Sequence, residues 1–162
     1  MSPTAEHFNQ VRALLETQRY AVLSTRQGNG HPYGSLVAFS AAPDLTHLVF
    51  CTLRATRKYA NLGIDARVSL LIDNRSNAET DLQRASAVTV LGTCQEPQGP
   101  PRERLLQSFL AQHPSMADFV RAPSCAVMRV DVRAYFLVTR FQNVVELHIQ
   151  QGEQDAVDTP SR

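Results

Sequence analysis

The sequence predicts a mainly β fold, a β-barrel with peripheral helices. Two observations support this prediction. Strand-like segments rich in Val, Leu, Phe and Thr follow one another along most of the chain, and turn residues join the first three by tight connections. An antiparallel run of this kind hides its edges most simply by closing into a barrel, and a β-sandwich is the alternative.

A helix is predicted first, over residues 4–18. Pro3 after Ser2 suits a helix start, and the apolar residues that follow recur at helical spacing: Phe8, Val11, Leu14 and Leu15. One apolar face on an otherwise polar helix indicates that this helix docks on the rest of the domain.

At Tyr20 the spacing of apolar residues changes from that of a helix to that of a strand. Segments 20–25, 32–41 and 46–53 are strand-like, and turn-forming residues separate them at QGNG (27–30) and at APD. QGNG lacks the ending of a phosphate-binding loop and stands between two strands, so a hairpin turn is predicted there. These three strands are expected to form an antiparallel meander.

The second half of the chain continues this pattern. Segments 66–73 and 84–96 are strand-like and flank a polar loop. Prolines and amphipathic spacing then predict two short helices, over 100–113 and 114–122, before the barrel closes. The last strand-like segments are 124–132, 134–141 and 144–149.

Length and composition favour one domain, residues 1–150, followed by a polar C-terminal tail, residues 151–162. The chain has 162 residues, and a hydrophobic content of 43% is enough for an ordinary core. The net charge of +1 leaves no general basic surface for nucleic acid or an anionic membrane. No apolar run reaches the ~20 residues of a membrane span, and the N-terminus lacks signal-peptide features, which favours a cytoplasmic protein.

Cysteine and histidine spacing predicts neither a disulfide framework nor a metal site. Cys51, Cys94 and Cys125 are far apart and odd in number, which predicts buried free thiols. The histidines are scattered without the spacing of metal ligands.

The stretch TLRATRKYANL, residues 52–62, is the strongest candidate for a binding site. It holds Lys58, the only lysine of the chain, beside Arg57 and directly after a predicted strand. A short helix beginning near Thr56 would add first-turn N–H groups and a hydroxyl, and together these groups suit a phosphate. The alternative is a solvated basic turn.

The pattern T-x3-T-R-K-x3-L followed by ARVSLLI resembles the pyridoxamine 5'-phosphate oxidase family of FMN-binding split barrels. The resemblance covers residues 15–95 well and the remainder loosely. It implies a six-stranded antiparallel FMN-binding split barrel that forms a homodimer, with FMN at the subunit interface.

The resemblance also implies roles for particular residues. Arg57 and Lys58 would grip the FMN phosphate beside Thr56, and Cys51 and Thr52 at the end of the preceding strand would touch the cofactor. The strand before it would run along the isoalloxazine edge. Its residues expected to bind the cofactor are Ser35, Leu36, Val37 and Ala38.

Two departures from the family pattern argue against the vitamin-forming oxidase itself. Ser40 stands where that enzyme has a lysine beside the flavin ring, and Ala87 stands where it has a glutamine. The resemblance therefore implies a related FMN-dependent oxidoreductase, which transfers a hydride or electrons between a donor such as NAD(P)H and another small-molecule redox substrate. The alternative is a flavin, deazaflavin or haem carrier or sensor without turnover, and His148 is the haem ligand that the resemblance would suggest.

Overall fold

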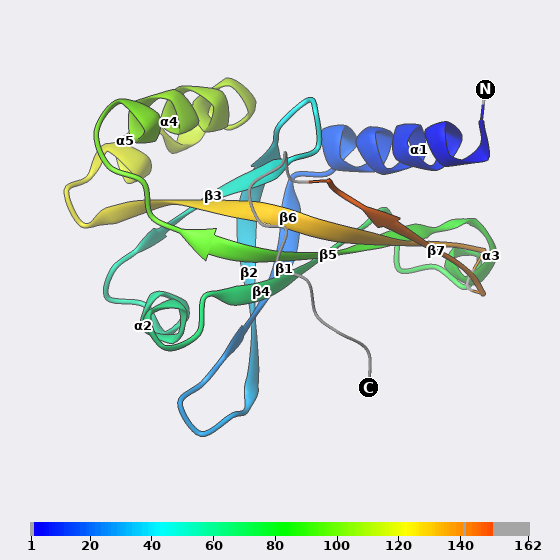
Figure 1. Ribbon diagram of the computed structural model, residues 1–162, viewed down its shortest axis with the longest axis horizontal. Helices are drawn as coiled ribbons and strands as arrows, with labels where there is room; N and C mark the ends of the chain where they lie inside the picture. Colours follow the sequence, from blue (N-terminus) through cyan, green and yellow to red (C-terminus); the bar gives the residue numbers. More distant parts are fainter. Residues whose placement is uncertain (1, 141, 151–162) are drawn as a thin grey trace, which may run out of the picture.

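The computed structural model describes residues 2–140 and 142–150, so the predicted tail 151–162 lies outside the described residues. Figure 1 labels its elements, which follow the chain in this order: α1 (Pro3–Thr17), β1 (Tyr20–Arg26), β2 (Pro32–Ala41), β3 (His47–Leu53), α2 (Arg57–Ile64), β4 (Arg67–Asp73), α3 (Asp81–Arg84), β5 (Ser86–Gln95), α4 (Pro100–Gln112), the 3-10 turn Pro114–Met116, α5 (Ala117–Arg121), β6 (Cys125–Thr139) and β7 (Asn143–His148).

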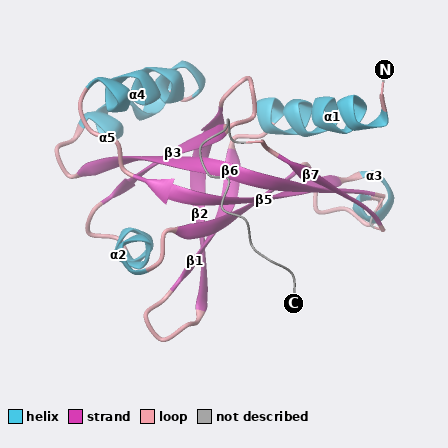
Figure 2. Ribbon diagram, in the orientation of Figure 1, coloured by secondary structure: helices cyan, strands magenta, loops and turns pink. Residues whose placement is uncertain are grey.

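The strands form a closed antiparallel barrel, as the sequence predicts. Their order is β3-β2-β1-β4-β5-β6, and pairing of β3 with β6 closes the ring of six strands. Strand β7 pairs with the second half of β6, whose first half pairs with β3. Figure 2 shows the helices outside the strands, with α1 and α4 on one side and α2 on the other.

The separation of segments 124–132 and 134–141 into two strands is wrong, because β6 runs unbroken from Cys125 to Thr139. Leu91 of β5 pairs with Ala134, whereas the adjacent Gly92 pairs with Val132, so Arg133 is an extra residue in β6. Such a bulge bends a strand without turning the chain. The interruption of the strand pattern at Arg133 is therefore a bulge, not a turn.

Local hydrogen bonds stabilise the start of α1 and the polar loop before β5. The predicted helix 4–18 is α1, capped by the Ser2 hydroxyl, which accepts from the Ala5 N–H at 3.2 Å. The polar loop before β5 contains a four-residue helix, α3, that was not predicted. The Asp81 carboxylate organises this loop by accepting from the N–H groups of Ser76 and Ala78.

The core has two parts. Alternate residues of the strands fill the barrel, among them the fully buried Phe39, Phe50 and Tyr135. A second apolar cluster lies between the outer face of the barrel and α4, and it includes Cys51 and Cys125. All three cysteines are buried and free, which confirms the prediction for them. No helix in the described part of the chain is long and apolar enough to cross a membrane.

Gly92 allows β5 and β6 to approach each other at the bulge. A Cβ atom there would lie 2.5 Å from the Asp131 carbonyl oxygen. We expect Gly92→Ala to lower the free energy of unfolding by about 1–3 kcal/mol, because backbone would have to move. The matched control is Gly63→Ala in α2, where nothing lies within 4 Å of the added atom. Urea denaturation of both variants tests this, and equal midpoints would contradict it.

Candidate functional site

The N-terminus of α2 is held by two threonines. Thr56 is its N-cap: its hydroxyl donates to the Leu53 carbonyl at 2.9 Å and accepts from the Tyr59 N–H at 3.4 Å. Thr52, the buried penultimate residue of β3, has its Oγ1 atom 2.9 Å from that of Thr56. The Thr56 hydroxyl donates to Leu53, which leaves it able to accept from the Thr52 hydroxyl, so the two threonines tie the end of β3 to the start of α2.

Arg57 and Lys58 are the first two residues of α2. Neither forms an ion pair within residues 2–140 and 142–150. The Arg57 guanidinium donates to Gln27 Oε1 at 3.2 Å and lies 5.8 Å from the centre of the Tyr33 ring. The first N–H groups of a helix have no acceptor within it, and the helix dipole adds partial positive charge there. The site therefore presents two cations and free N–H groups to an anion.

Strand β2 has an open edge next to this site. It pairs with β1 over Pro32–Ala38, but it pairs with β3 only through Phe39, Ser40 and Ala41. In an antiparallel strand every second residue points its N–H and C=O groups toward each side. Main-chain groups of residues 33–38 therefore face a side of β2 on which no strand of the described chain lies.

Two serines of β2 have buried hydroxyls without a hydrogen-bond partner in the described residues, Ser35 and Ser40. Such orphaned groups are rare in native proteins, and a bound ligand is one way to satisfy them. Ser35 lies in the open segment of β2, on the same face as Val37 and Phe39. An unpartnered hydroxyl, an open strand edge and two cations that form no ion pair in the described residues together fit a polar, phosphate-bearing cofactor.

The other predicted cofactor residues lie in three different places. The Val37 side chain is buried in the barrel core, whereas Leu36 points outward and is 69% exposed. Cys51 and Ala38 pack in the cluster under α4, so their side chains face away from Thr52. Burial raises the pKa of the Cys51 thiol to about 12, which keeps it protonated and unreactive. The backbone groups of Cys51, Val37 and Ala38 therefore remain as candidate cofactor contacts.

A half-buried hydrogen-bond network anchors α2, and the sequence did not predict it. Glu96, just after β5, accepts from Tyr59 Oη at 2.6 Å and from Arg54 Nη2 at 2.6 Å. Burial alone would raise the pKa of Glu96, but the hydrogen bonds from Tyr59 and Arg54 outweigh it and hold that pKa below its usual value. Glu96 lies 37 residues after Tyr59 and 42 after Arg54, too far along the chain for a local pattern to connect it to them.

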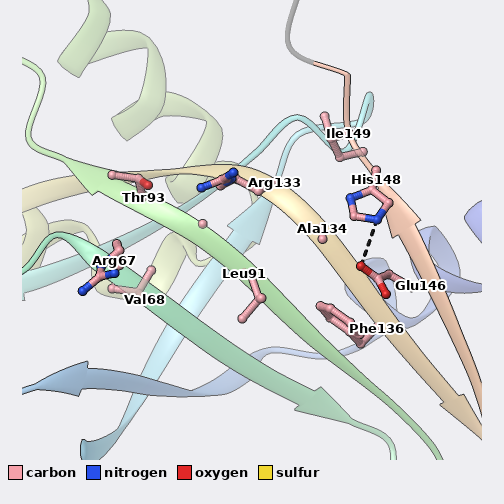
Figure 3. Close-up of a pocket in the computed structure, with 11 residues that line it drawn as sticks. Arg67, Val68, Leu91, Thr93, Arg133, Ala134, Phe136, Glu146, His148 and Ile149 are labelled. Atoms are coloured by element: carbon pink, nitrogen blue, oxygen red, sulfur yellow. Dashed lines mark ion pairs between the residues drawn. The ribbon is translucent and has the colours of Figure 1, made fainter. Parts of the chain in front are cut away.

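A separate surface cavity of about 550 Å³ lies over β5, β6 and β7 (Figure 3). Apolar side chains such as Val68, Leu91 and Phe136 line it, together with Arg67 and Arg133. His148 also lines it, with Nε2 2.8 Å from Glu146 Oε1. The bulge described above is what places Arg133 at this cavity.

The sequence matches the family model of pyridoxamine 5'-phosphate oxidase over residues 8–139. The chain belongs to this family. No curated protein matches the sequence closely.

Solved structures share the split-barrel fold of the pyridoxamine 5'-phosphate oxidase family. A heme binding protein from Mycobacterium smegmatis has a TM-score of 0.79 at 19% identity, covering 91% of this chain and 59% of that one. A FAD-binding protein from Mesorhizobium loti has a TM-score of 0.65 at 16% identity, covering 80% and 90%. A protein of the pyridoxinephosphate oxidase family from Clostridium acetobutylicum, related to general stress protein 26, has a TM-score of 0.69 at 12% identity, covering 89% and 95%. The chain thus spans about three fifths of the heme binding protein, and these identities show the fold alone.

Proposed function

We propose that this protein is a cytoplasmic FMN-dependent oxidoreductase that transfers a hydride or electrons between a donor such as NAD(P)H and a small acceptor. The observation that carries this proposal is the pair of unpaired cations, Arg57 and Lys58, on a capped helix N-terminus beside the open edge of β2. The structural similarity to a FAD-binding protein supports a flavin as the cofactor.

The residues have distinct roles in this proposal. The Arg57 guanidinium and the Lys58 ammonium bind the phosphate, together with first-turn N–H groups of α2. Thr52 and Thr56 hold that helix start in place. The open main-chain groups of β2 between Ser35 and Ala38 offer donors and acceptors to the flavin ring, and the Ser35 hydroxyl gains a partner. The bound flavin supplies the redox chemistry, so the chain needs no nucleophile of its own.

The substrate is proposed to differ from pyridoxamine 5'-phosphate. By the resemblance noted above, Ser40 and Ala87 stand where the vitamin-forming oxidases have a lysine and a glutamine. Ser40 is 1% exposed, and its strand pairs there with Val49 of the cluster under α4. A short buried hydroxyl cannot replace a lysine ammonium beside the ring, so we propose another small redox substrate.

We also propose that the protein is a homodimer, with the outer face of β1, β2 and β4 in the interface. Leu36 pairs with Val22, which pairs in turn with Leu71, so these three side chains form a row across the sheet. Leu36 is 69% exposed and Leu71 38%, and Tyr20 on the same face is 59% exposed. A contiguous exposed apolar patch of this kind marks an interaction surface, and a second copy is the partner that the family resemblance implies.

The absorption spectrum of the purified protein tests the proposed cofactor. We expect two flavin bands, present at purification or after adding FMN and removing the excess, and oxidation of NADH or NADPH faster than with free FMN. Absence of FMN binding would overturn the proposal, and Arg57 and Lys58 would then be either deazaflavin ligands or part of a solvated basic turn. Flavin bands without turnover would favour a carrier or sensor instead.

A haem-binding role is the second candidate, and the cavity at His148 favours it. This cavity combines an imidazole, several apolar side chains and two arginines, groups suited to a flat apolar molecule with carboxylates. The similar protein from Mycobacterium smegmatis is described as heme binding. Glu146 occupies Nε2 of His148, so iron ligation would use Nδ1 or require this pair to open. A Soret band that His148→Ala removes would support this candidate over FMN.

A further inference from the structure

We propose that Glu96 is a positioning residue that sets the strength of the phosphate site without touching the phosphate. This inference rests on the proposed FMN site. It concerns the hydrogen-bonded network of Arg54, Tyr59 and Glu96, whose groups bond one another and do not bond the side chains of Arg57 or Lys58.

The network joins α2 and three connections of the chain at one end of the barrel. Arg54 lies between β3 and α2, Tyr59 lies in α2, and Glu96 lies between β5 and α4. Arg54 Nη1 also donates to the carbonyl oxygens of Pro123 at 2.9 Å and Cys125 at 3.3 Å, at the start of β6. Figure 1 shows α2 at the same end of the barrel as the arrowhead of β5.

Helix α2 needs such an anchor because it has only eight residues. Isolated helices of this length are marginal in water, so tertiary contacts must hold this one in place. Tyr59 directly follows Lys58, and its N–H caps onto Thr56 while its hydroxyl binds Glu96. Tyr59 therefore links the start of α2 to Glu96, directly after β5. Loss of this hydrogen bond would let the start of α2 move, and with it the two phosphate-binding side chains.

The network also controls the charge near the site. Both carboxylate oxygens of Glu96 are occupied, Oε1 by Tyr59 and Oε2 by Arg54 and Gln98. A free carboxylate at this position would compete with phosphate for nearby cations. Arg54 is thus the counter-ion of Glu96 and not a third phosphate ligand.

The test compares dissociation constants of FMN and riboflavin, measured by quenching of flavin fluorescence. We expect Tyr59→Phe and Glu96→Gln to weaken FMN by roughly five- to tenfold, the effect of losing one hydrogen bond. Riboflavin lacks the phosphate, and its affinity should change by less than about twofold. Tyr59→Phe removes a single oxygen, so the test stands even if Glu96→Gln does not fold.

Asp65→Asn is the matched control. Asp65 is the C-cap of the same helix and pairs with Arg67 at 2.7 Å, so its loss breaks a similarly short ion pair at the other end of α2. We expect it to change neither affinity. Unchanged FMN binding in both network variants, or equal weakening of FMN and riboflavin, would overturn the positioning role. Wild-type protein that binds FMN no better than riboflavin would instead overturn the proposed phosphate site itself.

Discussion

Replacing both Arg57 and Lys58 by alanine is expected to remove most of the affinity for FMN. Each charged hydrogen bond to phosphate contributes about 1.5–3 kcal/mol, so each single replacement should weaken FMN about ten- to a hundredfold. The two residues are adjacent at the start of α2, so their effects need not add. Titration of apo-protein with FMN, followed by flavin fluorescence, measures the loss.

Arg84→Ala is the control for this experiment, because Arg84 is an exposed cation at the end of α3. It lowers the net charge by one unit without touching α2, and FMN affinity should stay at the wild-type value. Wild-type affinity in the Arg57/Lys58 double variant would show that these residues are a solvated basic turn.

Leu36→Glu is expected to convert the proposed homodimer into a monomer. Leu36 is the most exposed of the large apolar residues on the outer face of β2, β1 and β4. A carboxylate there would be buried without a partner in a dimer, a cost of several kcal/mol in each subunit. The barrel should remain folded, because Leu36 lies outside both apolar core clusters. Sedimentation velocity measures the change in mass.

Leu82→Glu provides the comparison for the dimer. Leu82 is 55% exposed on α3, outside the row formed by Leu36, Val22 and Leu71, and its replacement should leave the dimer intact. Wild-type protein that sediments as a monomer, or a Leu36→Glu variant that remains dimeric, would contradict the proposed interface.

Much of the fold was predictable because its signals are local. The hairpin turn at residues 27–30 is present: the Gly30 N–H donates to the Gln27 carbonyl at 2.9 Å, and Gly30 has φ = +88°. Helix α1 begins within one residue of its predicted start. The errors arose where a local break had a long-range cause. Arg133 interrupts the strand pattern as a bulge opposite Gly92, which no neighbouring residue signals.

The same division applies to the candidate site. The sequence by itself determined that Thr52, Thr56, Arg57 and Lys58 lie together, because a strand end and the first turn of a helix bring such neighbours within reach. The tertiary structure decided that β2 pairs with β3 only from Phe39 onward, that Cys51 faces α4, and that Glu96 accepts a hydrogen bond from Tyr59. Periodicity and capping depend on residues a few positions apart. Strand register and contacts across the barrel depend instead on how distant segments pack, which no short stretch of sequence specifies.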